Sequence, residues 1–137
     1  MNSVQNLSGS ERRNKIVLAI DDQAETLLLL QSFVEGAGYA FVSARRAREA
    51  VTLTDRVVPR LILLDIQMPN IDGFDTCRML RANPTLRTVP IAFLTARKTA
   101  EDVTAGLSAG GNDFIIKPFD PDKLLERIDY WVNRRVG

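Results

Sequence analysis

The chain has 137 residues, 45% of them hydrophobic and 26% charged, which suits one folded domain with one sizeable core. Its net charge of +1 gives no electrostatic reason to expect direct binding to nucleic acid or to an anionic membrane. The single cysteine excludes an intrachain disulfide, and the absence of histidine removes the commonest metal ligand and general base. No apolar run is long enough to span a membrane.

Apolar runs predict strands that alternate with helices from about residue 15 onward. Residues 1–14 are polar, so we expect a mobile N-terminal tail there and one domain over residues 15–136. Runs of four or five apolar residues without a polar break indicate strands buried on both faces. The expected strands are Ile16–Ile20, Tyr39–Ser43, Leu61–Asp65, Val89–Leu94 with Thr95 at its end, and Phe114–Ile116.

Apolar residues at helical spacing predict a helix after each strand. Capping residues mark several helix boundaries. Expected N-caps are Asp72, Thr99 and Asp120, and expected helix ends are Gly38 and Gly110. In the helix after Thr99, Val103 and Leu107 are expected to face the core. Five alternations of strand and helix predict an α/β fold with helices on both faces of a parallel sheet.

Four of the five strands end in a polar or charged group. These groups are Asp21 and Asp22 after the first strand, Asp65 at the third, Thr95 at the fourth and Lys117 after the fifth. Taken singly, each has an ordinary explanation as a helix cap, a strand-end hydroxyl or a surface charge. Because the carboxyl ends of parallel strands share one edge of the sheet, their joint placement favours one converging site.

The expected site combines three carboxylates with a cation and a hydroxyl. Carboxylates packed together repel one another, so either their pKa values rise or a cation compensates their charge. Oxygen ligands without histidine or thiolate suit Mg²⁺. Lys117 adds a positive charge, and Thr95 adds a hydroxyl able to bond a phosphoryl oxygen. Together these groups indicate phosphoryl transfer onto a carboxylate.

Four motifs in order resemble the receiver domain of two-component response regulators, the CheY-like family. They are Ile20-Asp21-Asp22, Leu63–Pro69 with Asp72-Gly73, Leu94-Thr95-Ala96 and Asp113–Phe119. The resemblance extends from about Lys15 to Val136. It implies a doubly wound, flavodoxin-like sheet of five parallel strands in the order 2-1-3-4-5, flanked by five helices.

The resemblance also implies a role for each site residue. Asp65 is the expected phosphoacceptor, with Thr95 and Lys117 contacting the phosphoryl group. The expected Mg²⁺ ligands are the side chains of Asp22 and Asp65, the backbone carbonyl of Gln67, and Asp21 acting mostly through water. Phe114 matches an aromatic switch whose ring turns inward as the threonine moves. Gln67 and Arg97 occupy the variable positions at the rim of the site, and the Lys117-Pro118 bond is expected to be cis.

The implied function is a phosphoacceptor in two-component signalling rather than an enzyme acting on a separate substrate. A histidine kinase or histidine phosphotransfer protein would be the donor, and an unidentified protein would read the active state. We expect a cytoplasmic monomer or weak homodimer, either a stand-alone receiver or an isolated part of a longer regulator.

A Mg²⁺-dependent phosphohydrolase with an aspartate nucleophile is the main alternative. Such enzymes usually carry a second acid two residues after the nucleophile, where this chain has Gln67. A nucleotide-binding fold is disfavoured because the glycines in residues 106–111 follow a helix rather than open one. The complete acid, threonine and lysine set disfavours a module that is never phosphorylated.

Overall fold

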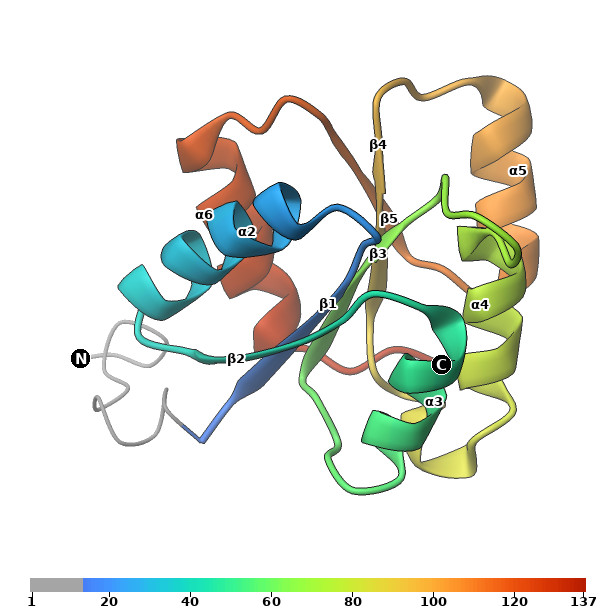
Figure 1. Ribbon diagram of the computed structural model, residues 1–137, viewed down its shortest axis with the longest axis horizontal. Coiled ribbons are helices and arrows are strands. Elements are labelled where there is room, and N and C mark those ends of the chain that lie inside the picture. The colour runs from blue at the N-terminus through green and yellow to red at the C-terminus, as the bar shows by residue number, and fades with distance from the viewer. Residues whose placement is uncertain (1–13) are drawn as a thin grey trace.

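The computed structural model describes residues 14–137, so the expected tail lies outside the described residues apart from Asn14. Five parallel strands form one sheet in the order β2-β1-β3-β4-β5 (Figure 1). The strands are β1 (Ile16–Ile20), β2 (Ala40–Ala44), β3 (Leu61–Asp65), β4 (Ile91–Thr95) and β5 (Asp113–Ile116). The expected fold class and strand order are confirmed.

Helices cover both faces of this sheet. They are α2 (Ala24–Gly36), α3 (Ala47–Thr54), α4 (Gly73–Arg81), α5 (Ala100–Ala109) and α6 (Pro121–Val132), with a short 3-10 turn η2 (Pro84–Leu86) before β4. Figure 1 shows α2 and α6 on one side of the sheet and α3, α4 and α5 on the other. The right-handed βαβ crossovers of parallel sheets produce such a layered arrangement.

The central strand β3 explains why its sequence is apolar without a break. Leu61 and Leu63 join the core beneath α2 and α6, while Ile62 and Leu64 join the core beneath α3, α4 and α5. All four residues are fully buried. A strand whose two faces are both covered needs no polar alternation, and it presents its first polar side chain only where it leaves the sheet, at Asp65.

Local capping fixes where the helices near the carboxyl edge begin and end. Asp72 Oδ1 accepts a hydrogen bond from the Asp75 N–H at 2.9 Å, and Thr99 Oγ1 accepts one from the Asp102 N–H at 3.1 Å. Asp120 caps α6, and Gly110 ends α5 with φ at +104°, a left-handed conformation that favours glycine. These expected caps are confirmed.

The expected orientation of Leu107 is wrong. Leu107 is 57% exposed, and α5 instead turns Gly106 and Ala109 toward the core. The phenyl rings of Phe93 and Phe114 already fill the space beneath Gly106, so a bulky residue has no room on that face. The inward face of α5 therefore carries Val103, which packs against the core as expected, together with Gly106 and Ala109 rather than its one leucine.

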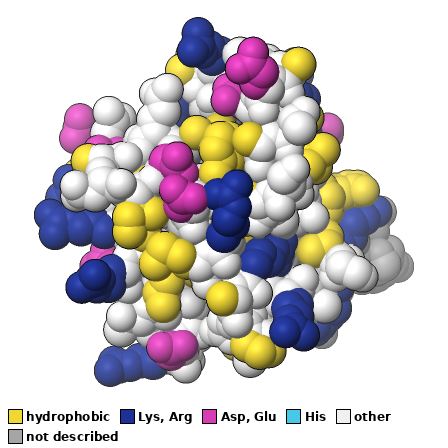
Figure 2. Space-filling view, turned by 90° about the vertical axis from the view of Figure 1, so that its right-hand side faces the viewer, with side chains coloured by type: hydrophobic (Ala, Val, Ile, Leu, Met, Phe, Trp, Pro, Cys, Tyr) yellow, Lys and Arg dark blue, Asp and Glu magenta, His cyan; other side chains and the backbone are white. Residues whose placement is uncertain are grey.

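The surface carries charges of both signs. On the face beside α4 and α5, Figure 2 shows lysine and arginine side chains dispersed among acidic and apolar ones.

Within residues 14–137, the helices lack the combination of length and apolar character that crossing a membrane requires.

Candidate functional site

Three carboxylates converge at the carboxyl edge of the sheet, as the strand ends predicted. Asp21 and Asp22 follow β1, and Asp65 ends the neighbouring strand β3. One carboxylate oxygen from each residue lies within 4.8 Å of the others. Asp21 is fully buried and Asp65 is 6% exposed, so these negative charges meet where little water can screen them.

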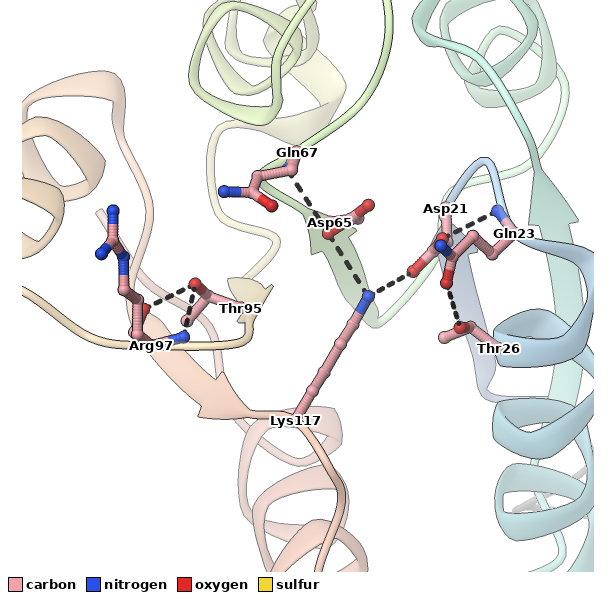
Figure 3. A network of polar contacts seen from close by, with 8 residues as sticks. All are labelled: Asp21, Gln23, Thr26, Asp65, Gln67, Thr95, Arg97 and Lys117. Carbon is pink, nitrogen blue, oxygen red and sulfur yellow. Dashed lines mark hydrogen bonds and ion pairs between the residues drawn. The ribbon is translucent and has the colours of Figure 1, made fainter.

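Lys117 reaches this cluster from the end of β5 (Figure 3). Its Nζ donates to Asp21 Oδ2 at 3.0 Å and to Asp65 Oδ1 at 3.4 Å. The backbone holds it there, since the Lys117 N–H donates to the Thr95 carbonyl at 2.7 Å. The Lys117-Pro118 bond is cis, as expected. One ammonium group therefore bridges two carboxylates that come from different strands.

The environment of Asp65 makes it harder to ionise than an ordinary aspartate. Burial, and after it repulsion from the nearby Asp21 carboxylate, raise the pKa of Asp65 from 3.8 to about 6. The Lys117 ammonium and the Gln67 N–H act in the opposite direction but do not cancel the increase. With this pKa, Asp65 is still largely ionised at neutral pH.

Thr95 lies at the end of β4, but its hydroxyl is directed into its own loop. Thr95 Oγ1 donates to the Arg97 carbonyl at 2.6 Å and accepts from the Arg97 N–H at 3.2 Å. Figure 3 shows this pair set apart from Asp65, with the Arg97 guanidinium pointing away from the carboxylates. Gln67 lies beside Asp65, to whose Oδ1 its N–H donates at 3.4 Å. Contact between Thr95 and a phosphoryl group therefore requires its hydroxyl to leave the Arg97 carbonyl.

Phe114 already occupies an inward position. It is 6% exposed, and its ring centroid lies 5.3 Å from that of Phe93. The ring fits because α5 carries Gly106 at this point, where a Cβ would lie 2.5 Å from Phe114 Cζ and 2.9 Å from Phe93 Cε2. The inward ring thus coexists with a Thr95 hydroxyl bonded within its own loop, and the expected coupling between the two stays a prediction.

Gly106→Ala should force the Phe114 ring out of its inward position. Inside a helix, alanine is normally more stable than glycine by about 1 kcal/mol. Here, however, the added methyl overlaps two rings, and overpacking typically costs about 1–3 kcal/mol. We expect a lower free energy of unfolding and weaker nuclear Overhauser effects between Phe114 and Phe93. Gly36→Ala is the matched control, because a Cβ there meets no atom within 4 Å. An unchanged ring contact in Gly106→Ala would contradict this packing argument.

Two residues that contribute to the site were assigned no role from the sequence, although Gly73 belongs to one of the motifs. Arg45, just after β2, donates from Nη2 and Nε to the Asp22 carbonyl at 2.7 and 3.2 Å. Gly73 lets α4 begin against the end of β3, since a Cβ there would lie 2.3 Å from the Asp65 carbonyl oxygen. The position of Arg45 at a strand end was a usable signal, because β2 ends at the same edge as the acidic strands.

Comparison with known proteins agrees with this fold and this group of residues. The model of the response regulator receiver domain matches residues 17–129. The DNA-binding response regulator MtrA of Mycolicibacterium paratuberculosis is 37% identical over 112 residues, which cover 82% of this chain and 48% of MtrA. The chain therefore spans about half the length of curated relatives of this kind.

Solved receiver structures superpose closely on the chain. The chemotaxis protein CheY4 of Vibrio cholerae has a TM-score of 0.83 at 27% identity, covering 85% of this chain and 98% of CheY4. The receiver domain of the sensor histidine kinase PA1611 from Pseudomonas aeruginosa, with a magnesium ion coordinated in its active site cleft, has a TM-score of 0.78 at 29% identity. The matched region covers 86% of this chain and 97% of the PA1611 receiver domain. By its sequence, its strand order and its acidic edge, the chain belongs to the family of response regulator receiver domains.

Proposed function

We propose that Asp65 accepts a phosphoryl group from a phosphohistidine on a histidine kinase or phosphotransfer protein. The observation that carries this proposal is the buried Asp65 carboxylate, bridged by Lys117 to Asp21 at an acidic sheet edge. A nucleophilic carboxylate with a cation beside it suits transfer of a charged phosphoryl group. The direct test is whether acetyl phosphate adds one acid-stable, base-labile phosphoryl group that peptide mapping assigns to Asp65.

In the transfer step, an Asp65 carboxylate oxygen attacks the phosphorus. The bond between phosphorus and the donor's histidine nitrogen breaks, and the imidazole keeps the electron pair. The Lys117 ammonium, 3.4 Å from Asp65 Oδ1, offsets negative charge on the transferred group. The Thr95 hydroxyl would donate to a phosphoryl oxygen once it leaves the Arg97 carbonyl. That movement links phosphorylation to the β4–α5 loop and provides a route to a second conformational state.

The acidic cluster also suits a Mg²⁺ ion. Its oxygens lie close enough to share one ion, and the repulsion from Asp21, which adds to burial in raising the pKa of Asp65, is the kind that a divalent cation relieves. Asp22, Asp65 and the backbone carbonyl of Gln67 would hold the ion, with Asp21 acting mostly through water. When bound, Mg²⁺ supplies additional positive charge for the phosphoryl oxygens.

Asp22→Ala should weaken Mg²⁺ binding by roughly tenfold or more, because it removes a carboxylate ligand. We would titrate the protein with Mg²⁺ in the absence of any phosphodonor and follow amide resonances near Asp65 by NMR. Glu25→Ala, an exposed acid in the first turn of α2, is the control for a general loss of negative charge. Equal Mg²⁺ affinities in the Asp22→Ala variant and the unaltered protein would remove Asp22 from the ligand set.

The chain's wider role follows from the same proposal. Phosphorylation and dephosphorylation of Asp65 would be the chain's only chemistry, so it would act as a signalling domain and not as a phosphohydrolase. Gln67 supports this view, because it places no second acid two residues after the nucleophile. We propose a cytoplasmic monomer or weak homodimer whose active state is read by a protein partner, without direct contact with nucleic acid or membrane.

The residues at the rim would set how long the phosphoryl group lasts. Hydrolysis needs a water in line with the bond from phosphorus to the Asp65 oxygen. Arg97 has no basic lone pair with which to activate that water, so we expect it to shield the group once release of Thr95 from the Arg97 carbonyl lets the loop turn the guanidinium toward the site. Arg97→Ala should shorten the half-life of phospho-Asp65 by about threefold, and adding Gln67→Ala should shorten it further. Decay would be followed by intact mass after removal of the donor at fixed Mg²⁺; an equal or longer half-life in Arg97→Ala would refute shielding.

A further inference from the structure

The acidic turn after β1 is tied to the end of β2 at two consecutive residues. The Asp21 N–H donates to the Ala44 carbonyl at 3.1 Å. The next carbonyl, that of Asp22, accepts two hydrogen bonds from the guanidinium of Arg45, at 2.7 Å from Nη2 and 3.2 Å from Nε. The end of β2 therefore supports the backbone from which two of the three clustered carboxylates project.

Arg45 is itself held in place. Its backbone N–H donates to Glu49 Oε1 at 2.6 Å, so a side chain from the first turn of α3 fixes the start of the turn that carries Arg45. This contact resembles the glutamate half of a capping box. The two parallel donors of the guanidinium then meet one oxygen, which restrains direction as well as distance.

We propose that Arg45 is a positioning residue for the metal site, acting through the backbone of Asp22. This proposal rests on the proposed function, because it assigns Asp22 as a Mg²⁺ ligand. Holding the Asp22 carbonyl fixes the peptide plane after Asp22 and with it the direction in which the carboxylate leaves the chain. A ligand whose orientation is set before the ion arrives loses less conformational freedom on binding.

The charge of Arg45 acts in the opposite sense. A guanidinium beside the acidic cluster repels a divalent cation, so removal of the charge alone would tighten Mg²⁺ binding. This repulsion passes through solvent, since Arg45 is exposed and lines an open groove, and salt screens it. We expect positioning to outweigh repulsion, and the direction of the change in Mg²⁺ affinity distinguishes the two effects.

Arg46 provides a matched control for charge. It is exposed and lines the same groove as Arg45 and Asp22. Within the described part of the chain, its side chain makes no hydrogen bond or ion pair. Arg46→Ala therefore removes the same charge from the same groove without removing a contact to Asp22.

The test is a Mg²⁺ titration of the full chain without phosphodonor, followed by NMR. Arg45→Ala should raise the Mg²⁺ dissociation constant by about fivefold. Loss of a partner that contacts a ligand group directly typically costs about 10- to 100-fold, and Arg45 contacts only the ligand's backbone carbonyl. Arg46→Ala should leave the dissociation constant unchanged or slightly lower. The ¹³C shift of the Asp22 carbonyl in the metal-free protein should change in Arg45→Ala and not in Arg46→Ala.

Arg45→Lys separates charge from geometry. This substitution keeps the positive charge but loses the paired N–H donors of the guanidinium. It should therefore weaken Mg²⁺ binding, but by less than Arg45→Ala does. The weakening in Arg45→Ala should persist at high ionic strength, where repulsion between charges is screened. The proposal fails if Arg45→Ala binds Mg²⁺ as tightly as the unaltered protein or more tightly, or if Arg46→Ala weakens binding equally. If the unaltered protein bound no Mg²⁺, the proposed function would fail as well, which is a different result from a normal titration that Arg45→Ala leaves unchanged.

Discussion

Asp65→Asn should abolish incorporation of the phosphoryl group completely. The amide is nearly the same shape as the carboxylate and its oxygen can still accept the hydrogen bond from Lys117, so the surrounding geometry should persist. It has no anionic oxygen to attack phosphorus, and the chain offers no histidine as a substitute nucleophile. Intact mass after incubation with acetyl phosphate and Mg²⁺ should show one added phosphoryl group in the unaltered protein and none in the variant.

The control for this experiment is Asp72→Asn. Asp72 lies seven residues further along the same loop region, is exposed, and caps α4 through an oxygen that asparagine also provides. This variant should be phosphorylated at the rate of the unaltered protein. Persistent labelling of Asp65→Asn would move the acceptor to another carboxylate of the cluster, such as Asp21, and would refute the assignment of Asp65.

The features of the fold that could be predicted depend on short-range rules. Alternation of apolar strands and amphipathic helices identified five of each, and Asp72, Thr99, Asp120 and Gly110 marked helix boundaries where the structure has them. The convergence of Asp21, Asp22 and Asp65 followed from one topological fact, that the ends of parallel strands share an edge. The strand order itself came from resemblance to a family rather than from the pattern of residues.

The features that could not be predicted depend on packing and on side-chain conformation. Helical spacing alone placed Leu107 inward, but the two rings beneath Gly106 decide which face of α5 is buried. The Thr95 hydroxyl has a partner two residues away in its own loop, a local choice that the residue's identity does not reveal.

Arg45 was missed for a different reason. Its partner is a backbone carbonyl, and a contact between a side chain and the backbone of a distant residue leaves no pairing of residue types in the sequence. The second strand was also expected to end at Ser43, one residue before the structure ends it at Ala44.

The ionised form of Asp65 should destabilise the fold that it serves. In the folded chain, burial and the Asp21 carboxylate raise the pKa of Asp65 from 3.8 to about 6, so the folded state binds a proton more tightly than the unfolded state. The contribution of Asp65 to the free energy of unfolding therefore falls as pH rises from about 4 to about 6, and the loss is complete above that range. A pKa difference of about two units corresponds to about 3 kcal/mol, which we take as the upper limit.

Asp65→Asn should consequently raise the free energy of unfolding by about 2 kcal/mol near neutral pH without Mg²⁺, and by almost nothing below about pH 4. Urea unfolding at several pH values would measure this difference, with Asp55→Asn, at the exposed end of α3, as a control expected to stay within about 0.5 kcal/mol. Added Mg²⁺ should narrow the difference, because it binds and stabilises the folded unaltered protein more than the variant. Two results would show that desolvation and repulsion at Asp65 do not limit stability. One is an Asp65→Asn variant that is less stable than the unaltered protein at neutral pH. The other is a difference in the free energy of unfolding that persists at low pH. The substitution that should end phosphorylation should thus stabilise the folded chain, because keeping the Asp65 carboxylate buried and charged lowers the free energy of unfolding.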